Sequence, residues 1–158
     1  MKRFVRQALS VLLMVSLSLV AILIAPPAAQ AAAIAHSFTE VTTQQTTTST
    51  TYVDITGASI ASGSFVAGKK YLLVVIAHVT NDDVNTLFAI KCVHGTTDFT
   101  ESISEEEPQP AATYFSYGFA TIWTAVSGEG IKLQFRTGTA ANATRADQIT
   151  LFAMNLSD

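Results

Sequence analysis

The chain has 158 residues and a formal net charge of −3, and its composition is 49% hydrophobic and 13% charged. All twelve acidic side chains follow residue 31, whereas three of the nine basic ones precede it, so residues 32–158 carry six positive against twelve negative charges, a net charge of −6. Such an acidic chain lacks the basic surface that nucleic-acid binding requires, and it offers no attraction to anionic lipid. We therefore expect no nucleic-acid partner.

The first 31 residues have the layout of a secretory signal peptide. A basic start, residues 2–6, precedes an apolar run of 18 residues, 8–25. Pro26-Pro27 then interrupts the helix, and an alanine-rich cleavage site ends at Ala31. The alternative is a retained membrane anchor, because 18 apolar residues lie at the lower limit for a spanning helix. We expect a secreted or cell-surface protein, and membrane association only if this hydrophobic helix is retained.

A threonine- and glutamine-rich stretch occupies residues 32–51. Six threonines, two glutamines and one serine lie between Thr42 and Thr50. Threonine favours strands because its branched Cβ suits the pleat, so we expect a polar edge strand from Phe38 to Thr47. A linker and an O-glycosylated leader remain alternatives. An exposed edge can pair with another chain, which makes Phe38–Thr51 a candidate assembly edge.

Residues 52–158 are predicted to form a β-sandwich domain. Tyr71–Thr80 is apolar on both faces, as is typical of a central strand, and Ile131–Thr137 alternates with period two. Further strands are expected at Tyr52–Thr56, Thr86–His94, Thr113–Val126 and Gln148–Leu156. Turn signals separate these segments, which predicts seven or eight antiparallel strands in an all-β, jelly-roll-like sandwich.

One strand carries a stripe of aromatic residues. Alternation between Thr113 and Val126 places Phe115, Tyr117, Phe119 and Trp123 on the same face. A sandwich needs large aromatic side chains in its core. Exposed aromatics could instead stack on sugar rings, so Tyr117, Phe119 and Trp123 are the candidate ligand-binding residues.

No catalytic or cofactor signature is present. The sequence has no Gly-x-Ser-x-Gly nucleophile motif, and its one cysteine, Cys92, is expected to pack as a small apolar side chain. Cys92 and His94 point the same way from one strand, but a zinc site needs three or four ligands. An acidic group, Asp98, Glu101 and Glu105–Glu107, lacks the spacing of a specific calcium loop. We predict no catalytic residues, no metal site and no cofactor.

Three segments carry a resemblance to a known group of proteins: "TTSTTYVDITGASI" with "GSFVAGKKYLLVVIAHV", "IWTAVSGEGIKLQF" and "ITLFAMNLSD". Together they resemble β-sandwich modules associated with phage virion and tail-fibre proteins. The resemblance covers Thr47–Asp158 and implies a sandwich fold, but no site residues can be carried over from it. The signal peptide departs from it, because tail proteins assemble in the cytoplasm.

These observations favour a non-enzymatic structural or attachment module, either virion-like or part of a cell-surface fibre. We expect it to be exported and to associate with itself as a trimer or a filament. The alternative is a carbohydrate-binding domain that takes a glycan through Tyr117, Phe119 and Trp123. A hydrolase acting through unidentified carboxylates is the third hypothesis.

Overall fold

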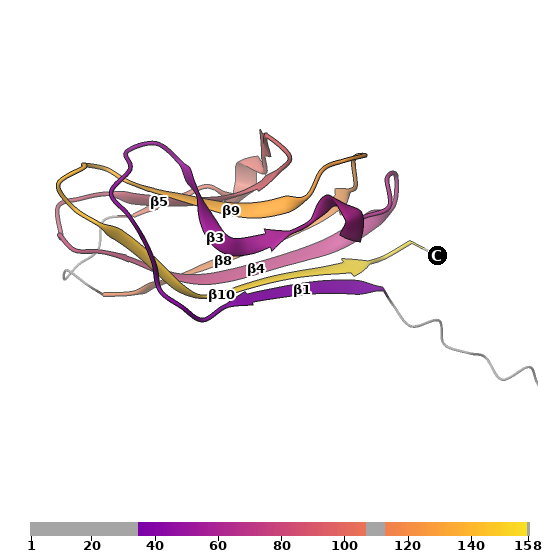
Figure 1. Cartoon of the computed structure of the whole chain (residues 1–158), viewed down its shortest axis with the longest axis horizontal. Coiled ribbons are helices and arrows are strands. Elements are labelled where there is room, and N and C mark those ends of the chain that lie inside the picture. The colour runs from indigo at the N-terminus through magenta and orange to yellow at the C-terminus, as the bar shows by residue number, and fades with distance from the viewer. Residues whose placement is uncertain (1–34, 107–112, 158) are drawn as a thin grey trace, which may run out of the picture. The chain divides into compact units, whose positions relative to one another are not determined.

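The computed structural model describes residues 35–106 and 113–157. These residues form two antiparallel sheets and two short 3₁₀ segments, η1 (Ser62–Ser64) and η2 (Thr100–Ser102) (Figure 1). The expected signal peptide or anchor, residues 1–31, lies outside the described residues. Within the described part, no helix has the length and hydrophobicity needed to cross a membrane. The prediction of an all-β sandwich is confirmed for this part.

The first sheet has the strand order β1-β10-β4-β8, and a short β2 also pairs with β10. Its strands are β1 (His36–Val41), β2 (Gln45–Thr47), β4 (Lys70–Asn81), β8 (Phe115–Thr124) and β10 (Thr144–Asn155). As expected for Tyr71–Thr80, β4 is an interior strand, paired along its length with β10 on one side and β8 on the other.

The second sheet has the order β3-β9-β5-β6, and β7 also pairs with β5. Its strands are β3 (Val53–Ile60), β5 (Phe88–His94), β6 (Thr97–Asp98), β7 (Ser104–Glu106) and β9 (Ile131–Thr137). The chain passes from one sheet to the other between β3, β4 and β5, and again between β8, β9 and β10. These crossings give the jelly-roll-like order that the sequence predicted.

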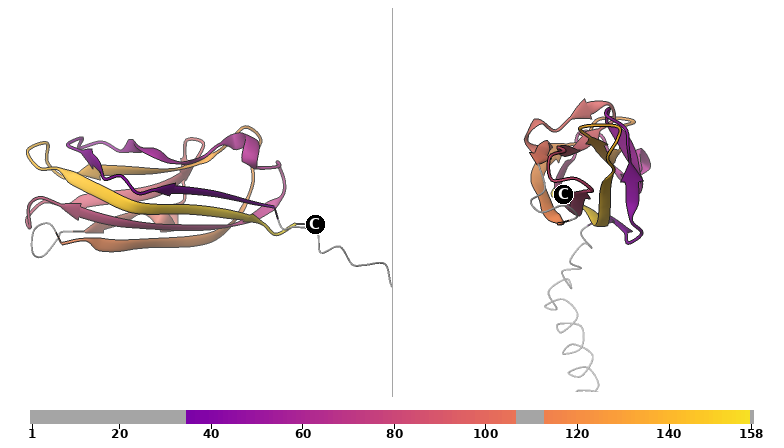
Figure 2. Two further views of the ribbon diagram at one scale, coloured as in Figure 1. Left: turned by 60° about the horizontal axis from the view of Figure 1, so that its bottom comes forward. Right: turned by 90° about the vertical axis from the view of Figure 1, so that its left-hand side faces the viewer.

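The core lies between the facing sheets, which are seen end-on in Figure 2. Alternate residues of each strand enter it, as the period of two requires. The largest fully buried hydrophobic side chains are Phe88, Leu73, Ile90, Ile131, Leu133, Ile149 and Leu151. Each buried leucine or isoleucine contributes about 1.5–3 kcal/mol relative to an exposed one, so this layer holds the two sheets together without a disulfide.

The structure corrects the predicted strands in three places. The described residues contain ten strands rather than seven or eight, because three pieces, β2, β6 and β7, have only two or three residues each. The expected strand Phe38–Thr47 is divided into β1 and β2. In addition, β10 begins at Thr144, four residues before the predicted start at Gln148, and a bulge at Gln148 divides its register.

Candidate functional site

The predicted ligand-binding aromatics face the core. Tyr117, Phe119 and Trp123 are 7%, 7% and 6% exposed, because alternation along β8 turns them toward the second sheet. The hydroxyl of Tyr117 donates a hydrogen bond of 2.7 Å to the carbonyl of Ser102. Burial raises the pKa of this phenol well above its usual value. The expected aromatic binding face is therefore not formed by these residues, whereas their alternative role as core is observed.

Trp123 is the centre of a cluster of rings at one end of the core. Phe65 and Phe99 meet it edge-on, with ring centroids 5.1 Å and 6.3 Å away, and the His94 ring lies 5.5 Å away. His94 Nδ1 is 2.5 Å from Oε2 of Glu129. The indole is thus enclosed by other side chains of the same chain and has no open face for a sugar.

The residues weighed as metal ligands are not brought together. Cys92 is fully buried, and desolvation raises the pKa of its thiol to about 12, so the thiol is protonated at neutral pH. His94 pairs with Glu129, and His78 lies on β4 in the other sheet. In the segments that the structure describes, no three histidine, cysteine or acidic side chains are grouped closely enough to hold a metal ion.

Two members of the acidic group form ion pairs across strands. Asp98 accepts a bond of 2.7 Å from Lys91, and Glu105 accepts one of 2.7 Å from Arg136. The bond to Glu105 also raises the pKa of the Arg136 guanidinium. Glu107 lies outside the described residues. The carboxylates are therefore used in part to hold strands of the second sheet, and the hydrolase hypothesis stays an untested prediction.

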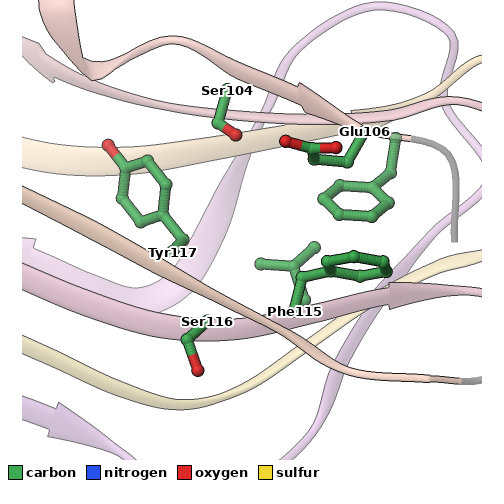
Figure 3. A pocket seen from close by; sticks show the side chains of 7 residues that line it. Ser104, Glu106, Phe115, Ser116 and Tyr117 are labelled. Atoms are coloured by element: carbon green, nitrogen blue, oxygen red, sulfur yellow. The ribbon is translucent and has the colours of Figure 1, made fainter.

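A small pocket opens between β8 and β7 (Figure 3). Phe115, Ser116 and Tyr117 line it from β8, and Ser104 and Glu106 line it from β7. Its volume is about 70 Å³, whereas pockets for small-molecule ligands usually measure about 300–1,000 Å³. The described walls offer room for a few water molecules, but not for a glycan.

In the described part, the outer face of the first sheet is unusual because it is largely apolar. Apolar side chains cover it in neighbouring strands, alternating with the residues that enter the core. We call this surface the outer apolar face; its members are Phe38, Leu72, Val74, Ile76, Gly118, Ala120, Ile122, Phe152 and Met154. Phe38, Ile76 and Ile122 are 56%, 47% and 62% exposed. Large exposed apolar side chains in adjacent positions mark interaction surfaces more often than scattered ones do.

The strand register arranges these side chains in rows across the sheet. One row runs from Phe38 through Phe152 and Val74 to Ala120. The next runs through Met154 and Leu72 to Ile122, with His36 at its β1 end. A third row contains Ile76 and Gly118, with the polar residues Thr150 and Glu40 at its β10 and β1 positions. The apolar residues therefore form one continuous patch that extends over four strands.

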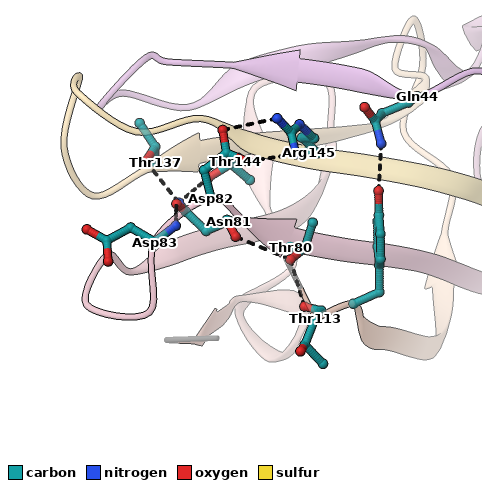
Figure 4. Close-up of polar contacts among 10 residues, drawn as sticks. Gln44, Thr80, Asn81, Asp82, Asp83, Thr113, Thr137, Thr144 and Arg145 are labelled. Carbon is teal, nitrogen blue, oxygen red and sulfur yellow. Dashed lines mark hydrogen bonds and ion pairs between the residues drawn. The ribbon is translucent and has the colours of Figure 1, made fainter. Parts of the chain in front are cut away.

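A polar group closes one end of this face (Figure 4). The hydroxyl of Tyr114 accepts a hydrogen bond of 2.6 Å from Nε2 of Gln44, and the Tyr114 ring lies 6.5 Å from the His78 ring. Arg145 contacts Asp82 at 2.6 Å. Partial burial and the nearby Asp147 carboxylate raise the pKa of Tyr114. The apolar patch therefore has a polar boundary at this end.

The outer face of the second sheet has the opposite character. Asp54 accepts bonds of 2.8 Å from Lys132 and 2.6 Å from Gln134. Both bonds favour the ionised form and lower the pKa of Asp54. Lys91 lies 4.2 Å from the centre of the Tyr52 ring, in addition to its ion pair with Asp98. This face presents charged and polar side chains. The apolar character of the outer surface is therefore specific to the first sheet.

The sequence carries a signal for the outer apolar face in the strand that was predicted to be central. Leu72, Val74 and Ile76 alternate with the core residues of β4, which makes this strand apolar on both sides. That pattern is typical of a strand covered on both faces. The described structure covers one side only.

Comparison with known proteins identifies a fold but no family. The sequence matches no protein-family model, and the comparison with curated proteins finds no relative. The structure of Eiger TNF from S. frugiperda is similar at 10% identity, with a TM-score of 0.52, over 79% of this chain and 94% of that one. This likeness shows the shared sandwich fold alone.

Viral capsid proteins are also among the structural neighbours. The infectious bursal disease virus Gx strain structure aligns at 9% identity over 78% of this chain and 36% of that one, with a TM-score of 0.46. A pentameric capsid protein from metagenomic phage sequences aligns at 15% identity over 68% and 60%, with a TM-score of 0.33. The resemblance to β-sandwich modules stands, at low identity, and these two likenesses are too distant to indicate a shared role.

Proposed function

We propose that this protein is a non-enzymatic structural or attachment module that is exported and associates with copies of itself. The observation that carries the proposal is the outer apolar face, because a sheet that leaves Phe38, Ile76 and Ile122 largely exposed has apolar surface to bury. Burying apolar surface contributes about 25 cal/mol per Å² and is the main drive for association.

Export rests on the signal-peptide layout of residues 1–31. An exported chain with a single, buried cysteine forms no internal disulfide, so its stability depends on packing within and between copies. Export and the dependence on packing both agree with a structural module that assembles outside the cytoplasm.

The residues on which the carbohydrate-binding alternative depended are not accessible. It depended on exposed side chains at Tyr117, Phe119 and Trp123, and all three are buried. These three side chains are therefore not available to stack on a sugar, and carbohydrate binding serves as the control hypothesis.

The experiment is a mass measurement on the protein recovered from a secreting host, with its N-terminus read by mass spectrometry. Light scattering over a range of concentrations, with electron microscopy of the same sample, is expected to show a defined oligomer or a filament. A monomer at every concentration would contradict self-association. Retention of residues 1–31 in the purified chain would contradict cleavage and favour the anchor.

A further inference from the structure

We infer that copies of this chain meet at the outer apolar face, with the β1–β10 half of one copy against the β8 half of the next. The inference rests on the proposed self-association and names the surface that performs it. It replaces the assembly edge expected at Phe38–Thr51.

The edge expected from the sequence is poorly suited to strand addition. β1 has six residues, and the strand is interrupted before the three residues of β2. The hydroxyl of Thr39 in β1 donates a bond of 2.9 Å to the carbonyl of Ser59 in β3, so this side of the first sheet is tied to the second. A continuous strand from another copy would meet an edge divided into pieces of six and three residues, and short edge strands discourage such pairing.

The size of the outer apolar face matches the centre of a protein interface. Four strands about 4.8 Å apart, with outward residues about 6.8 Å apart along each strand, give a projected area of about 400 Å² for three rows. This area includes the polar positions His36, Thr150 and Glu40 at its β1–β10 side. Stable interfaces bury about 800 Å² on each partner, with an apolar core inside a polar rim. Here the rim is polar at the end formed by Tyr114 and His78, and Thr124 and Lys70 border the opposite end.

The occupant is a second copy because the two halves of the face complement each other in size. The large rings of Phe38 and Phe152 lie on β1 and β10, whereas β8 presents Ala120 in the same row and Gly118 in the next. A Cβ added to Gly118 would have no neighbour within 4 Å, so the surface above it is open. The projecting rings of one copy can therefore fill the shallow half of another.

A lipid surface suits this face less well. Glu40 is exposed in the same sheet, in register with Thr150 beside Ile76, and residues 32–158 carry an excess of negative charge. A carboxylate entering the boundary of a bilayer costs free energy unless it is neutralised. A protein surface can instead leave Glu40 at the rim, in water.

The first test compares acidic substitutions on and off the face, in the protein from the secreting host. Ile76→Glu and Ile122→Glu are expected to reduce the mass to that of a monomer. The matched controls Val66→Glu and Ile103→Glu replace apolar residues that are 59% and 44% exposed outside the face, and they should leave the mass unchanged. Circular dichroism and thermal unfolding of each variant check that it is folded.

The second test needs no disruptive change. Ala120→Cys adds a thiol at an exposed position on β8, in the middle row of the face. Ala61→Cys adds one at an exposed position beside η1, while the natural Cys92 is buried. In the assembled protein, Ala120→Cys is expected to react with a thiol reagent at least tenfold more slowly than Ala61→Cys. Adding Ile122→Glu should restore its reactivity.

The outcomes of the two tests distinguish failure of the proposed interface from failure of the proposed self-association. A wild-type monomer overturns both proposals. An oligomer that keeps its mass with Ile76→Glu and Ile122→Glu, and whose Ala120→Cys thiol reacts freely, overturns the inference and leaves self-association intact. A monomer whose Ala120→Cys thiol is protected only by phosphatidylcholine vesicles assigns the face to lipid instead. Loss of assembly with the two face variants alone, together with thiol protection, supports the inference.

Discussion

Tyr114 and Gln44 are 70 positions apart in the sequence, and their side chains meet with the phenol oxygen 2.6 Å from the amide nitrogen. Tyr114 immediately precedes β8 at one edge of the first sheet, and Gln44 lies between β1 and β2 at the other. The contact therefore joins the two edges across the outer surface of β4 and β10 and fixes the polar end of the outer apolar face.

Removing this contact is expected to loosen the edge strands. Tyr114→Phe should lower the free energy of unfolding by about 1 kcal/mol, the usual value of one hydrogen bond, and Gln44→Ala should cost a similar amount. The double variant should cost less than the sum of the two, because the same bond is removed. Urea denaturation of the four proteins measures the coupling; strictly additive losses would show that the bond contributes nothing.

Gly130 stands where two backbone segments approach closely. A Cβ at this position would lie 2.6 Å from the carbonyl oxygen of Ile60 and 2.9 Å from the amide nitrogen of Ser62. Since backbone must move to admit it, Gly130→Ala should destabilise the protein by about 1–3 kcal/mol. Gly63→Ala is the matched control, because its Cβ would meet nothing within 4 Å. Equal melting temperatures of the two variants would contradict the close approach.

Asn81 is fully buried and connects the two sheets (Figure 4). Its amide nitrogen donates to the hydroxyls of Thr144 in β10 at 3.1 Å and Thr137 in β9 at 3.2 Å. Asn81→Ala should cost about 2–3 kcal/mol, because it also leaves buried hydroxyls without a donor. In a Thr137→Val background, Asn81→Ala should lower the free energy of unfolding by less, because the Thr137 hydroxyl that it would leave without a donor is already absent. Chemical denaturation checks this; an unchanged cost would show that the Thr137 bond is not part of the connection.

Cys92 makes stability depend on pH in the alkaline range. Burial raises the pKa of its thiol from 9.0 to about 12. This contribution is complete below pH 9, where the thiol is protonated in both states, and it is lost as pH rises from 9 toward 12, because only the unfolded chain releases the proton. At about 1.36 kcal/mol per pH unit, the loss between pH 9 and pH 10.5 is about 2 kcal/mol.

The Cys92 effect is isolated by comparison with Cys92→Ala. Urea denaturation at pH 8 and pH 10.5 should show about 2 kcal/mol more alkaline loss in the wild type, because the buried tyrosines contribute equally to both proteins. A thiol reagent should modify wild-type Cys92 only on unfolding. Identical pH dependence in the two proteins would show that the thiol is not protected as the structure indicates.

Trp123 is the one tryptophan of the chain and reports directly on the aromatic core. Because the indole is enclosed by Phe65, Phe99 and His94, its emission should lie at short wavelength and resist quenching by acrylamide. Titration with monosaccharides and oligosaccharides should leave the spectrum unchanged, and denaturant should shift it to longer wavelength. A saturable change with sugar would revive the carbohydrate-binding alternative.

Alternation within strands made much of the fold predictable from sequence. Ile131–Thr137 matches β9 at both ends, and the stripe of Tyr117, Phe119 and Trp123 does share one face. Alternation assigns residues to two faces but does not say which face is covered. The sequence alone therefore left open whether the stripe was core or binding surface.

Other features depend on contacts that no local pattern contains. Thr144 and Ala146 precede the strand predicted from Gln148, yet both are buried in β10, where they pair with β4 and β2. The edge position of β1 was predicted, but its partner β10 was not, since the two strands lie far apart in the sequence. The apolar character of β4 was recognised, but its uncovered side follows from the position of neighbouring strands.

Gln148 has a consequence that extends to half of β10. Its positive φ of 47° inserts one extra residue, so Ala146 faces inward before it and Ile149, Leu151 and Ala153 face inward after it. The alternation of inward and outward side chains along β10 therefore shifts by one residue at this single position. A related sequence without this one residue would place Ala146 and Ile149 two positions apart, so simple alternation would keep both side chains inward without a bulge. Loss of a different single residue in the second half of β10, with the bulge retained, would instead exchange inside for outside beyond that point. Length variation in this strand is therefore expected at the bulge, where one residue can be lost while the same side chains stay in the core.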